Sequence, residues 1–398
     1  MGARLKEQGY KIRCLNLIDF DQSDLFNPLV YFNPRQAEVD CTILTENFMA
    51  NTSGNKPSSS DGFWEKAERA LLNALISYIY STKGAQGTLI NVVDLLGQMQ
   101  ASEQDETAQS IVDITFEAAT EVIADYDANP HGWGEEATAA INGLRFACAQ
   151  YNSYSQGAGE TKKSVIISLG VRMAPLHMAQ IRKLLSADTI QLDTVGQEKT
   201  ALFMVIPDTH AAFTFLISIF YEQFFETNLY IADHSPDGHL PIQVQCLMDE
   251  FANIGKMPSF ERKIAVMRSR WISTVIIIQN FAQGKALYKD DWKTIVGNCD
   301  SFLFLGGNEK STTEYVSKLL GKQTIAATDT SLTKGRNGSY STSEKRLGRD
   351  LLTPDEIATL PTHQCIYALR GVPPFLARKL TPPKLESEYV HSSTVHQR

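Results

Sequence analysis

Long hydrophobic runs are missing from this 398-residue sequence. No stretch reaches the roughly 18 apolar residues that a helix needs to cross a bilayer, and the N-terminus has no signal-peptide pattern. We therefore expect no membrane-spanning segment here, so that any work at a membrane would need an anchor on another chain or segment. A composition of 43% hydrophobic and 21% charged residues is that of an ordinary globular protein.

Paired metal-ligand motifs are missing as well. The six cysteines and eight histidines are scattered, with no C-x-x-C, H-x-x-x-H or H-E-x-x-H pattern. This spacing argues against a zinc site and favours a reducing, cytosolic setting. Four of the cysteines lie in apolar stretches, where a free thiol behaves as a small hydrophobic group: Cys14, Cys148, Cys246 and Cys365.

Basic residues are scarce in one part of the chain. Residues 61–150 hold fourteen Asp and Glu against four Lys and Arg, a local balance of −10, so the rest of the chain carries +2. The same part has helical spacing and no β-type alternation; "DGFWEKAERALLNALISYIY" places Phe63, Ala67 and Leu71 near one face. We predict an all-helical domain at 61–151 whose electrostatic character differs from that of its surroundings.

From Leu202 onwards the pattern changes to short apolar runs with helices between them. The runs "ALFMVIP", "VQCLMDE", "STVIIIQ" and "SFLFLGG" are spaced as βαβ units require. Strands that are apolar on both faces indicate an α/β fold with a parallel sheet covered on both sides. A strand at Lys11–Asp19 is expected to join this sheet. The predicted α/β domain thus comprises residues 1–60 and 152–381, interrupted by the helical domain.

Two segments are predicted to lack packed structure. Residues 327–350 are rich in Gly, Ser and Thr and are predicted to form a long mobile loop, and residues 382–398 a disordered tail. Five basic residues of the loop outnumber its three acids, which is compatible with contact to a DNA backbone; a solvated hairpin is the alternative. The five are Lys334, Arg336, Lys345, Arg346 and Arg349.

The run "CLMDEFANIGKMPSF" at 246–260 is an apolar strand that ends in two adjacent carboxylates, Asp249 and Glu250. In a parallel α/β sheet, ligands bind beyond the carboxyl ends of the strands. An apolar strand followed by Asp-Glu is typical of the Walker B motif of nucleotide hydrolases. In that motif the first acid holds Mg²⁺, usually through water, and the second orients or deprotonates the attacking water. The alternative is that both acids cap the next helix.

The next apolar strand, "STVIIIQN", ends in Gln279, where a sensor of the γ-phosphate or of the attacking water would lie. Between the two strands, "ERKIAVMRSRW" is predicted to be a helix whose end carries Arg268 and Arg270. Such an arginine can reach a neighbouring subunit's nucleotide and neutralise transition-state charge. The alternative is that both arginines interact with the dipole at the helix C-terminus.

These motifs, in this order, closely resemble the type IV coupling proteins, the hexameric DNA-pump ATPases of conjugation and type IV secretion systems. The resemblance covers nearly the whole chain, and the 246–280 block is its most specific part. The matching segments are "YKIRCLNLIDFDQSDLFNPL", "DGFWEKAERALLNAL", "ALFMVIPD", "CLMDEFANIGKMPSFERKIAVMRSRWISTVIIIQN", "IVGNCDSFLFLGGNEKSTTEYVSKLLG" and "LLTPDEIATLP".

The resemblance implies a RecA-like nucleotide-binding domain interrupted by an all-α domain, with ATP and Mg²⁺ as ligands. By motif match, Asp249 and Glu250 are the Walker B acids, with Asp249 holding Mg²⁺ through water. Gln279 is the sensor glutamine. Arg268 is the finger in preference to Arg270, because its spacing from Glu250 and Gln279 matches the family.

One element of the family is absent from the sequence. A P-loop needs G-x-x-x-x-G-K-[ST], whose backbone amides and lysine hold the phosphates. Gly-Lys occurs only at 255–256, 284–285 and 321–322, followed by Met, Ala and Gln. In the family the P-loop and the membrane anchor precede the segment that matches residue 10. We therefore expect the chain to be the C-terminal portion of a coupling protein, with little ATPase activity of its own.

The family's function implies a motor at the cytoplasmic side of the bacterial membrane. It recruits single-stranded DNA with its attached relaxase, or protein cargo, and passes it to other components of the secretion channel. Two alternatives stay open: a naturally short, non-catalytic module that docks secretion substrates or the coupling-protein hexamer, and a chromosome pump of the FtsK type. The large helical insertion suits coupling proteins better than the latter.

Acidic residues are concentrated around one predicted helix of the insertion. Asp113, Glu117 and Glu121 recur every four residues, which aligns them along one face. A docking surface for basic signal segments on cargo is one interpretation, and a solubilising helix face is the other. The remaining acids of the cluster are Glu103, Asp105, Glu106, Asp125 and Asp127.

Overall fold

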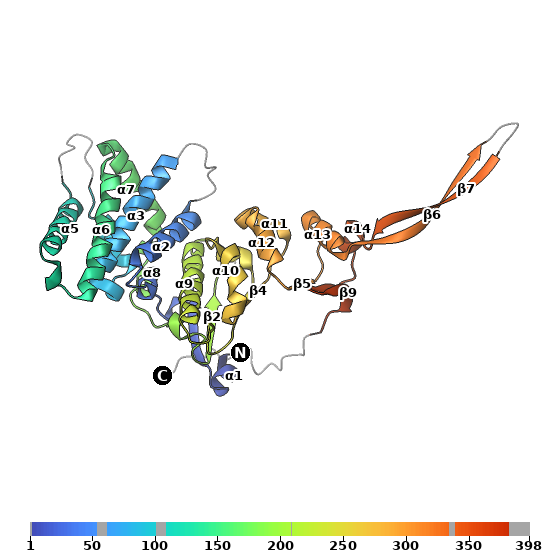
Figure 1. Ribbon diagram of the computed structural model, residues 1–398, viewed down its shortest axis with the longest axis horizontal. Coiled ribbons are helices and arrows are strands. Elements are labelled where there is room, and N and C mark those ends of the chain that lie inside the picture. Colours follow the sequence, from blue (N-terminus) through green and yellow to red (C-terminus); the bar gives the residue numbers. More distant parts are fainter. Residues whose placement is uncertain (1, 54–61, 101–108, 208, 334–338, 382–398) are drawn as a thin grey trace. The chain divides into compact units, whose positions relative to one another are not determined.

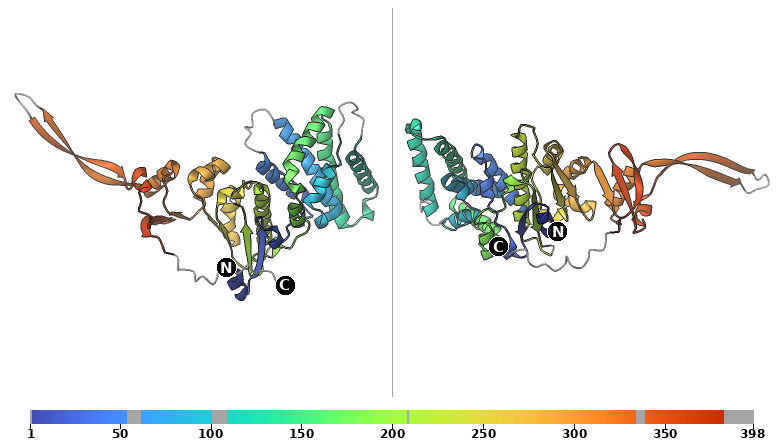
Figure 2. Two further views of the ribbon diagram at one scale, coloured as in Figure 1. Left: turned by 180° about the vertical axis from the view of Figure 1, so that it is seen from behind. Right: turned by 90° about the horizontal axis from the view of Figure 1, so that it is seen from below.

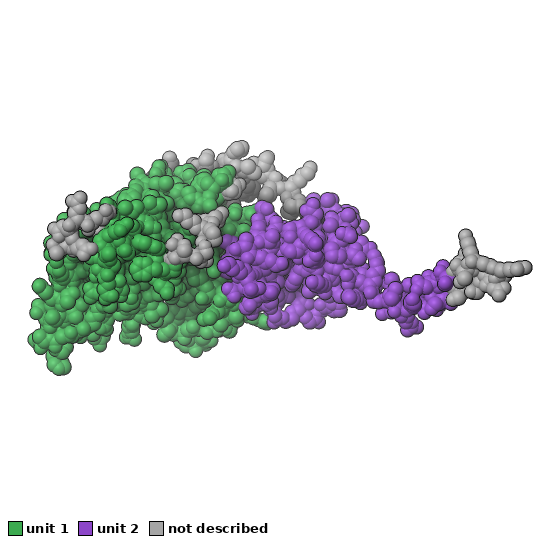
Figure 3. Space-filling view, turned by 90° about the horizontal axis from the view of Figure 1, so that it is seen from above, with its two compact units in different colours: residues 1–275, 391–398 green, residues 276–390 purple. Residues whose placement is uncertain are grey.

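The described residues form two compact units, one ending at residue 275 and one beginning at residue 276 (Figure 3). No described helix is both long and apolar enough for a bilayer. A computed structural model describes residues 2–53, 62–100, 109–207, 209–333 and 339–381. The predicted tail at 382–398 lies outside these residues.

The first unit contains the α/β part predicted from the strand pattern. After a short helix, α1 (Gly2–Glu7), strand β1 (Lys11–Asn16) pairs in parallel with β2 (Thr200–Val205), with Lys11 opposite Thr200. The predicted pairing of the N-terminal strand with a later strand is therefore confirmed for β2, whereas among the described residues the strands at 244–248 and 272–276 pair with each other in a separate sheet. The helical layer is inserted between two neighbouring strands of one sheet.

Strands β3 (Val244–Met248) and β4 (Ile272–Ile276) are also hydrogen-bonded neighbours. The amide of Val244 donates to the carbonyl of Trp271, 2.9 Å away, so the two strands start side by side and run in the same direction. Helices α9 (Thr214–Asp233) and α10 (Phe260–Met267) cover one face of the strands of this unit (Figures 1 and 2).

The cover predicted for both faces of the strands is not complete within the described part of this unit. Leu247 of β3 is 66% exposed and Val275 of β4 is 38% exposed, whereas Met248 is fully buried. Successive side chains of a strand point to opposite faces, so one face of β3 packs on the helices and the other carries an exposed leucine. The apolar run indicates a strand correctly but does not show how many of its faces are covered.

The helical layer surrounds the long helix α3. Helix α3 packs along α6, and Ser77 of α3 donates to the carbonyl of Gly143 of α6 (2.9 Å). The predicted boundary at 151 falls inside α6, because the helical period continues and α7 also packs against α3. The helices are α2 (Ala37–Thr52), α3 (Gly62–Lys83), α4 (Leu89–Leu96), α5 (Ile111–Ala128), α6 (Glu135–Ser155), α7 (Gly159–Met173) and α8 (Ala179–Leu184).

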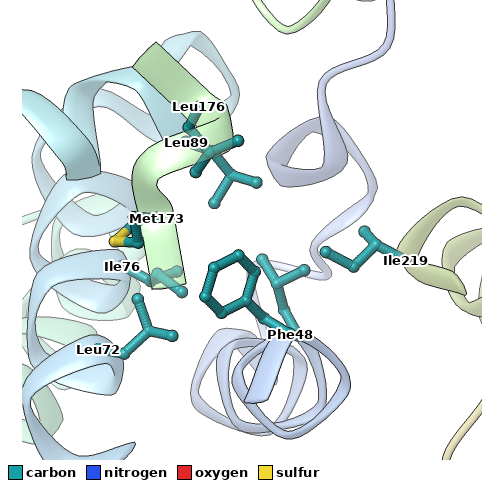
Figure 4. Close-up of a pocket in the computed structure, with 8 residues that line it drawn as sticks. Phe48, Leu72, Ile76, Leu89, Met173, Leu176 and Ile219 are labelled. Atoms are coloured by element: carbon teal, nitrogen blue, oxygen red, sulfur yellow. The ribbon is translucent and has the colours of Figure 1, made fainter. Parts of the chain in front are cut away.

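Helix α2 joins this layer to the α/β part, because it packs against both α3 and α9. At the junction Phe48 of α2, Ile76 of α3, Met173 of α7 and Ile219 of α9 point toward the same space (Figure 4). The cavity there is about 10 Å³ and lined by apolar side chains. That volume holds at most one water, so the space is a packing void rather than a ligand site.

The second unit has an antiparallel sheet. Strand β5, predicted to extend the parallel sheet, instead pairs antiparallel with β8, which forms a hairpin with β9 through Gly371 (φ 83°). The hydrophobic core of this second unit consists of Phe304, Val316, Ile357 and Ile366. The elements are α11 (Phe281–Tyr288), α12 (Asp291–Gly297), β5 (Ser301–Phe304), α13 (Lys310–Leu320), α14 (Pro354–Ala358), β8 (Gln364–Leu369) and β9 (Val372–Arg378).

The prediction of a long mobile loop at 327–350 is wrong. Strands β6 (Lys322–Thr333) and β7 (Ser339–Asp350) form an antiparallel ribbon that extends away from the rest of this unit (Figure 1). Threonine-rich segments suit strands, and the ribbon's polar residues reach water on both faces. Lys345 pairs with Asp329 and Arg349 with Glu356, each at 2.6 Å. Two of the basic residues proposed to contact DNA thus have acidic partners; Lys334 and Arg336 lie outside the described residues.

Candidate functional site

The two predicted Walker B acids follow β3 directly. Asp249 is exposed and Glu250 is half-buried, while the fully buried Met248 fixes the end of the strand. Glu250 has left-handed backbone angles (φ 50°, ψ 47°), and its carbonyl accepts from the amide of Asn253 at 2.7 Å. A non-glycine residue held in this conformation costs about 1–3 kcal/mol, and such strain is concentrated at functional sites. The chain therefore turns sharply at the residue expected to orient water.

The turn continues through a short 3₁₀ helix, Phe251–Ile254, whose two end residues are buried. Gly255 follows with φ 88°. The side chain of Asn51, near the end of α2, then bonds the backbone of Lys256 on both sides: its Oδ1 accepts from the amide (2.8 Å) and its Nδ2 donates to the carbonyl (2.9 Å). The acid-bearing turn is thus held to a helix far away in the sequence.

The predicted sensor, Gln279, comes three residues after β4. The backbone amide of Gln279 donates to Oε1 of Gln283 in α11, 3.0 Å away, and Asn280 caps the same helix. Gln279 belongs to the second unit and the acids to the first. Their proximity therefore stays a prediction.

The two candidate finger arginines differ in their surroundings. Arg268 comes directly after α10 and is exposed. Arg270 donates from Nε to Oδ1 of Asp233 at the end of α9, 2.8 Å away, and its side chain is 28% exposed. This ion pair holds Arg270 against the end of α9, and the choice of Arg268 as the finger stays a prediction.

A buried ionic cluster that the sequence analysis missed holds α10 against α9. Nζ of Lys263 contacts Oε1 of Glu222 (2.7 Å), Oε1 of Glu226 (2.9 Å) and the carbonyl of Pro258 (3.2 Å), which uses all three of its donors. Burial opposes the charge on Lys263, but the two carboxylates outweigh it and raise the pKa of its ammonium group. The available signal was Glu222 and Glu226, two acids four residues apart in a helix rich in apolar residues.

The residues at the end of β3 fit a magnesium–nucleotide ligand of the expected kind. Mg²⁺ keeps several waters and is bound by one or two carboxylates plus substrate phosphates, so the exposed Asp249 alone suffices on the protein side. Among the described residues no group of three or more His, Cys, Asp or Glu converges on one point. An all-protein metal cage is therefore not what this part of the chain offers.

The acidic stripe predicted on the insertion lies on α5, and its three members differ. Asp113 completes a capping box with the N-cap residue Ser110: its carboxylate accepts from the backbone amide of Ser110 (2.7 Å) and from the hydroxyl of Tyr151 (2.6 Å). These bonds lower the pKa of its carboxyl against the opposing effect of burial. Glu117 and Glu121 are exposed. Of the three, these two are exposed to a partner. Asp125 is exposed as well, and Asp127 pairs with Arg145 of α6; Glu103, Asp105 and Glu106 lie outside the described residues.

Solved structures of the bacterial conjugative coupling protein TrwB resemble this chain. The unbound form gives a TM-score of 0.58 at 14% identity, and the match covers 92% of this chain and 73% of TrwB. The complex of TrwB with ADP and Mg²⁺ gives 0.55 at 14% identity over the same shares of the two chains. The fold is therefore α/β, a RecA-like domain with an inserted all-α domain, as predicted.

The sequence comparisons then define the family. The chain belongs to the type IV secretory system conjugative DNA transfer family, whose model matches residues 1–383. Protein VirD4 of Agrobacterium fabrum is 27% identical over 139 residues, which are 35% of this chain and 21% of VirD4. The conjugal transfer protein TraG of Escherichia coli is 30% identical over 134 residues, 32% of this chain and 21% of TraG. These matches span about a fifth of each relative.

Proposed function

We propose that the chain is the cytosolic portion of an ATP-driven coupling protein. Working as a hexamer at the cytoplasmic side of the bacterial membrane, the motor recruits a relaxase bound to single-stranded DNA and passes it to other components of the secretion channel. The observation that carries the proposal is the Asp249–Glu250 pair, placed by a left-handed turn at the carboxyl end of a parallel strand. Membership of the conjugative DNA transfer family supports it.

In this mechanism each site residue has a separate task. Asp249 would hold Mg²⁺ through water, and the chemistry that the metal would supply there is neutralisation of charge on the phosphates. Glu250 orients the attacking water and accepts its proton. Gln279 senses the γ-phosphate, and Arg268 extends to the nucleotide of the neighbouring subunit. The sequence supplies no P-loop lysine, so we expect this chain alone to position ATP poorly and to hydrolyse it at a negligible rate.

The test uses a version of the protein that carries a P-loop. Glu250→Gln removes the proton acceptor and keeps the shape, so we expect ATP binding to persist while hydrolysis falls by about a hundredfold or more. Binding is measured with a fluorescent ATP analogue and turnover by phosphate release. Glu314→Gln, a change of a half-exposed acid on α13, is the matched control. Near-normal turnover in Glu250→Gln would remove Glu250 from the mechanism.

A second candidate function, a module that docks cargo without catalysis, is favoured by the surface of α5. Beside Glu117 and Glu121, the helix exposes Ile111 (65%), Ile114 (54%) and Val122 (40%). Adjacent acidic and apolar stripes suit a basic amphipathic segment of protein cargo, because each stripe has a complementary counterpart. Docking and motor function are compatible, but the docking module needs no ATP.

Docking is tested by changing only the two exposed acids of the stripe. With Glu117 and Glu121 both replaced by Gln, we expect a basic amphipathic peptide to associate several-fold more slowly at low salt, and the difference to shrink at 0.5 M salt. Stopped-flow fluorescence of a labelled peptide measures the rate. The same replacement of Glu135 and Glu136, exposed acids of α6, is the control. Equal rates for wild type and variant at both salts would leave α5 as a solvated face.

A further inference from the structure

We propose that Asn51 is the positioning residue for the turn that carries Asp249 and Glu250, and that it transmits the state of the helical layer to that turn. The catalytic part of this inference rests on the function proposed above. The side-chain amide of Asn51 forms a two-way pair with the backbone of Lys256, and its Nδ2 also donates to the carbonyl of Asn47 (2.9 Å). One side chain therefore bonds both α2 and the turn.

The backbone at Gly255 and Lys256 is packed closely against two helices. A Cβ atom added to Gly255 would lie 2.5 Å from Oδ1 of Asn51 and 2.6 Å from Cγ2 of Thr214. The carbonyl of Lys256 also accepts from the hydroxyl of Ser218 of α9 at 2.9 Å. The backbone after the acids is thus pressed between α2 and α9, and glycine is needed both for space and for its positive φ.

Both ends of the acid-bearing turn are consequently fixed. Strand β3 holds the side before Asp249, and Asn51 holds the side after Gly255. The residues between them include the left-handed Glu250, a conformation that persists only when its surroundings enforce it. Without the Asn51 bonds, the Ser218 hydroxyl still bonds the carbonyl of Lys256. This end of the turn is then held less tightly and Glu250 can relax, which misplaces the carboxylate that must meet the attacking water.

The end of α2 is bonded in turn to the helical layer. Arg172 of α7 donates from Nη1 to the hydroxyl of Ser53 (3.0 Å) and forms an ion pair with Glu68 of α3 (Nε to Oε2, 2.8 Å). The side chains of Arg172 and Glu68 are only 17% and 5% exposed. Asn51 lies two residues before Ser53, so polar contacts run from α3 and α7 through α2 to the turn. Energetic coupling along such contacts is established only by a double-mutant cycle.

The first experiment needs no nucleotide and uses the present chain. Hydrogen exchange is followed in a peptide covering residues 249–257. We expect Asn51→Ala to raise its exchange about tenfold or more, and Arg172→Met to raise it in the Asn51 background but not in the Asn51→Ala background. The exposed Asn152→Ala serves as the control. Unchanged exchange in Asn51→Ala overturns the positioning role, and additive effects of the two changes overturn the transmission.

A second variant separates hydrogen bonding from general loosening. In Asn51→Asp the ionised carboxylate has lost the donor to the carbonyl of Lys256, whereas the protonated carboxyl regains one. Relative to wild type at the same pH, protection of the turn is expected to return as the pH falls below about 4. A loss that stays the same at low pH contradicts donation by residue 51.

The catalytic consequence is tested in the version that carries a P-loop. We expect Asn51→Ala to lower kcat about tenfold or more with the KM for ATP changed by less than about threefold, because the turn places water rather than nucleotide. An unchanged kcat, in a protein where Glu250→Gln is inactive, refutes the positioning role. If Glu250→Gln itself stays active, the proposed hydrolytic function fails while the exchange experiments still decide the contact.

Discussion

Asp40 in α2 is a partly buried carboxyl whose burial favours the protonated form. Burial raises the pKa of Asp40 from its ordinary 3.8 to about 6; the backbone amide of Asn33, 2.6 Å away, works against this shift, and the charges of Glu226 and Glu38 add to it. A pKa raised in the folded state means that the stabilising contribution is complete below about pH 3.8. It is lost as the pH rises through about 6.

The prediction at this scale is that Asp40→Asn removes that pH dependence. The oxygen of the new side-chain amide still accepts from the backbone amide of Asn33, but the side-chain amide does not ionise. The free energy of unfolding of wild type minus that of the variant is expected to fall between about pH 4 and 6 and to level off above about pH 7. Urea unfolding at several pH values measures this difference. A difference that stays constant with pH would show that Asp40 does not titrate in this range.

Individual residues also show the limit of sequence interpretation. Asp249 and Glu250 are conspicuous because two charges interrupt an apolar run, a signal contained in neighbouring residues. Lys263 and Asn51 give no such signal. Their partners, Glu222 and Lys256, are 41 and 205 residues away along the chain, so their importance appears only once the fold brings them together.

Helix α10 is held in place by a buried charge, the ammonium group of Lys263. In Lys263→Met, Glu222, with a side chain only 2% exposed, is left without its cation, and we expect unfolding to become easier by about 3–5 kcal/mol. Replacing Glu222 by Met as well is expected to recover part of that loss, because two apolar side chains replace the pair. Denaturant unfolding measures both variants. Lys293→Met, which alters an exposed pair with Asp290, is the control and should change stability by less than about 1 kcal/mol.

A smaller effect would mean that Glu222, whose pKa burial raises to about 7, takes up a proton or reaches water when Lys263 is absent. A double variant less stable than the single one would contradict the buried-charge explanation. The same cluster fixes the helix that ends just before Arg268, so its loss is also a loss of orientation for that arginine.

Elements whose patterns are local were predictable, and elements whose environment is non-local were not. The helices of the insertion follow from apolar spacing within each segment. The run "SFLFLGG" correctly indicates a strand, but β5 finds its partner β8 more than sixty residues later, and the apolar pattern is the same in either pairing direction. Thr- and Ser-rich sequence is shared by solvated loops and polar ribbons, which explains the wrong prediction for β6 and β7.

For the whole molecule, the RecA-like α/β fold with its helical insertion was predictable because family motifs recur in order along nearly the entire chain. The division at residue 275 was not. Each unit has its own buried core, and the core of the second consists of residues from two strands and two helices that look like a continuation of the first in sequence. Apolar runs show that a segment is buried but do not identify the core in which it is buried.

The parallel pairing of β1 with β2 has a consequence for the order of folding. Lys11 meets Thr200, so the contact closes a loop that contains the whole helical layer, whereas Thr333 of the ribbon meets Ser339 a few residues away. Loop closure is costly before such distant contacts form, and chains dominated by them fold slowly. The ribbon, a β-hairpin, can form within microseconds. The pairing of β1 with β2 must wait for the helical insert between them, so the sheet that joins the two ends of the insertion is a late product of folding.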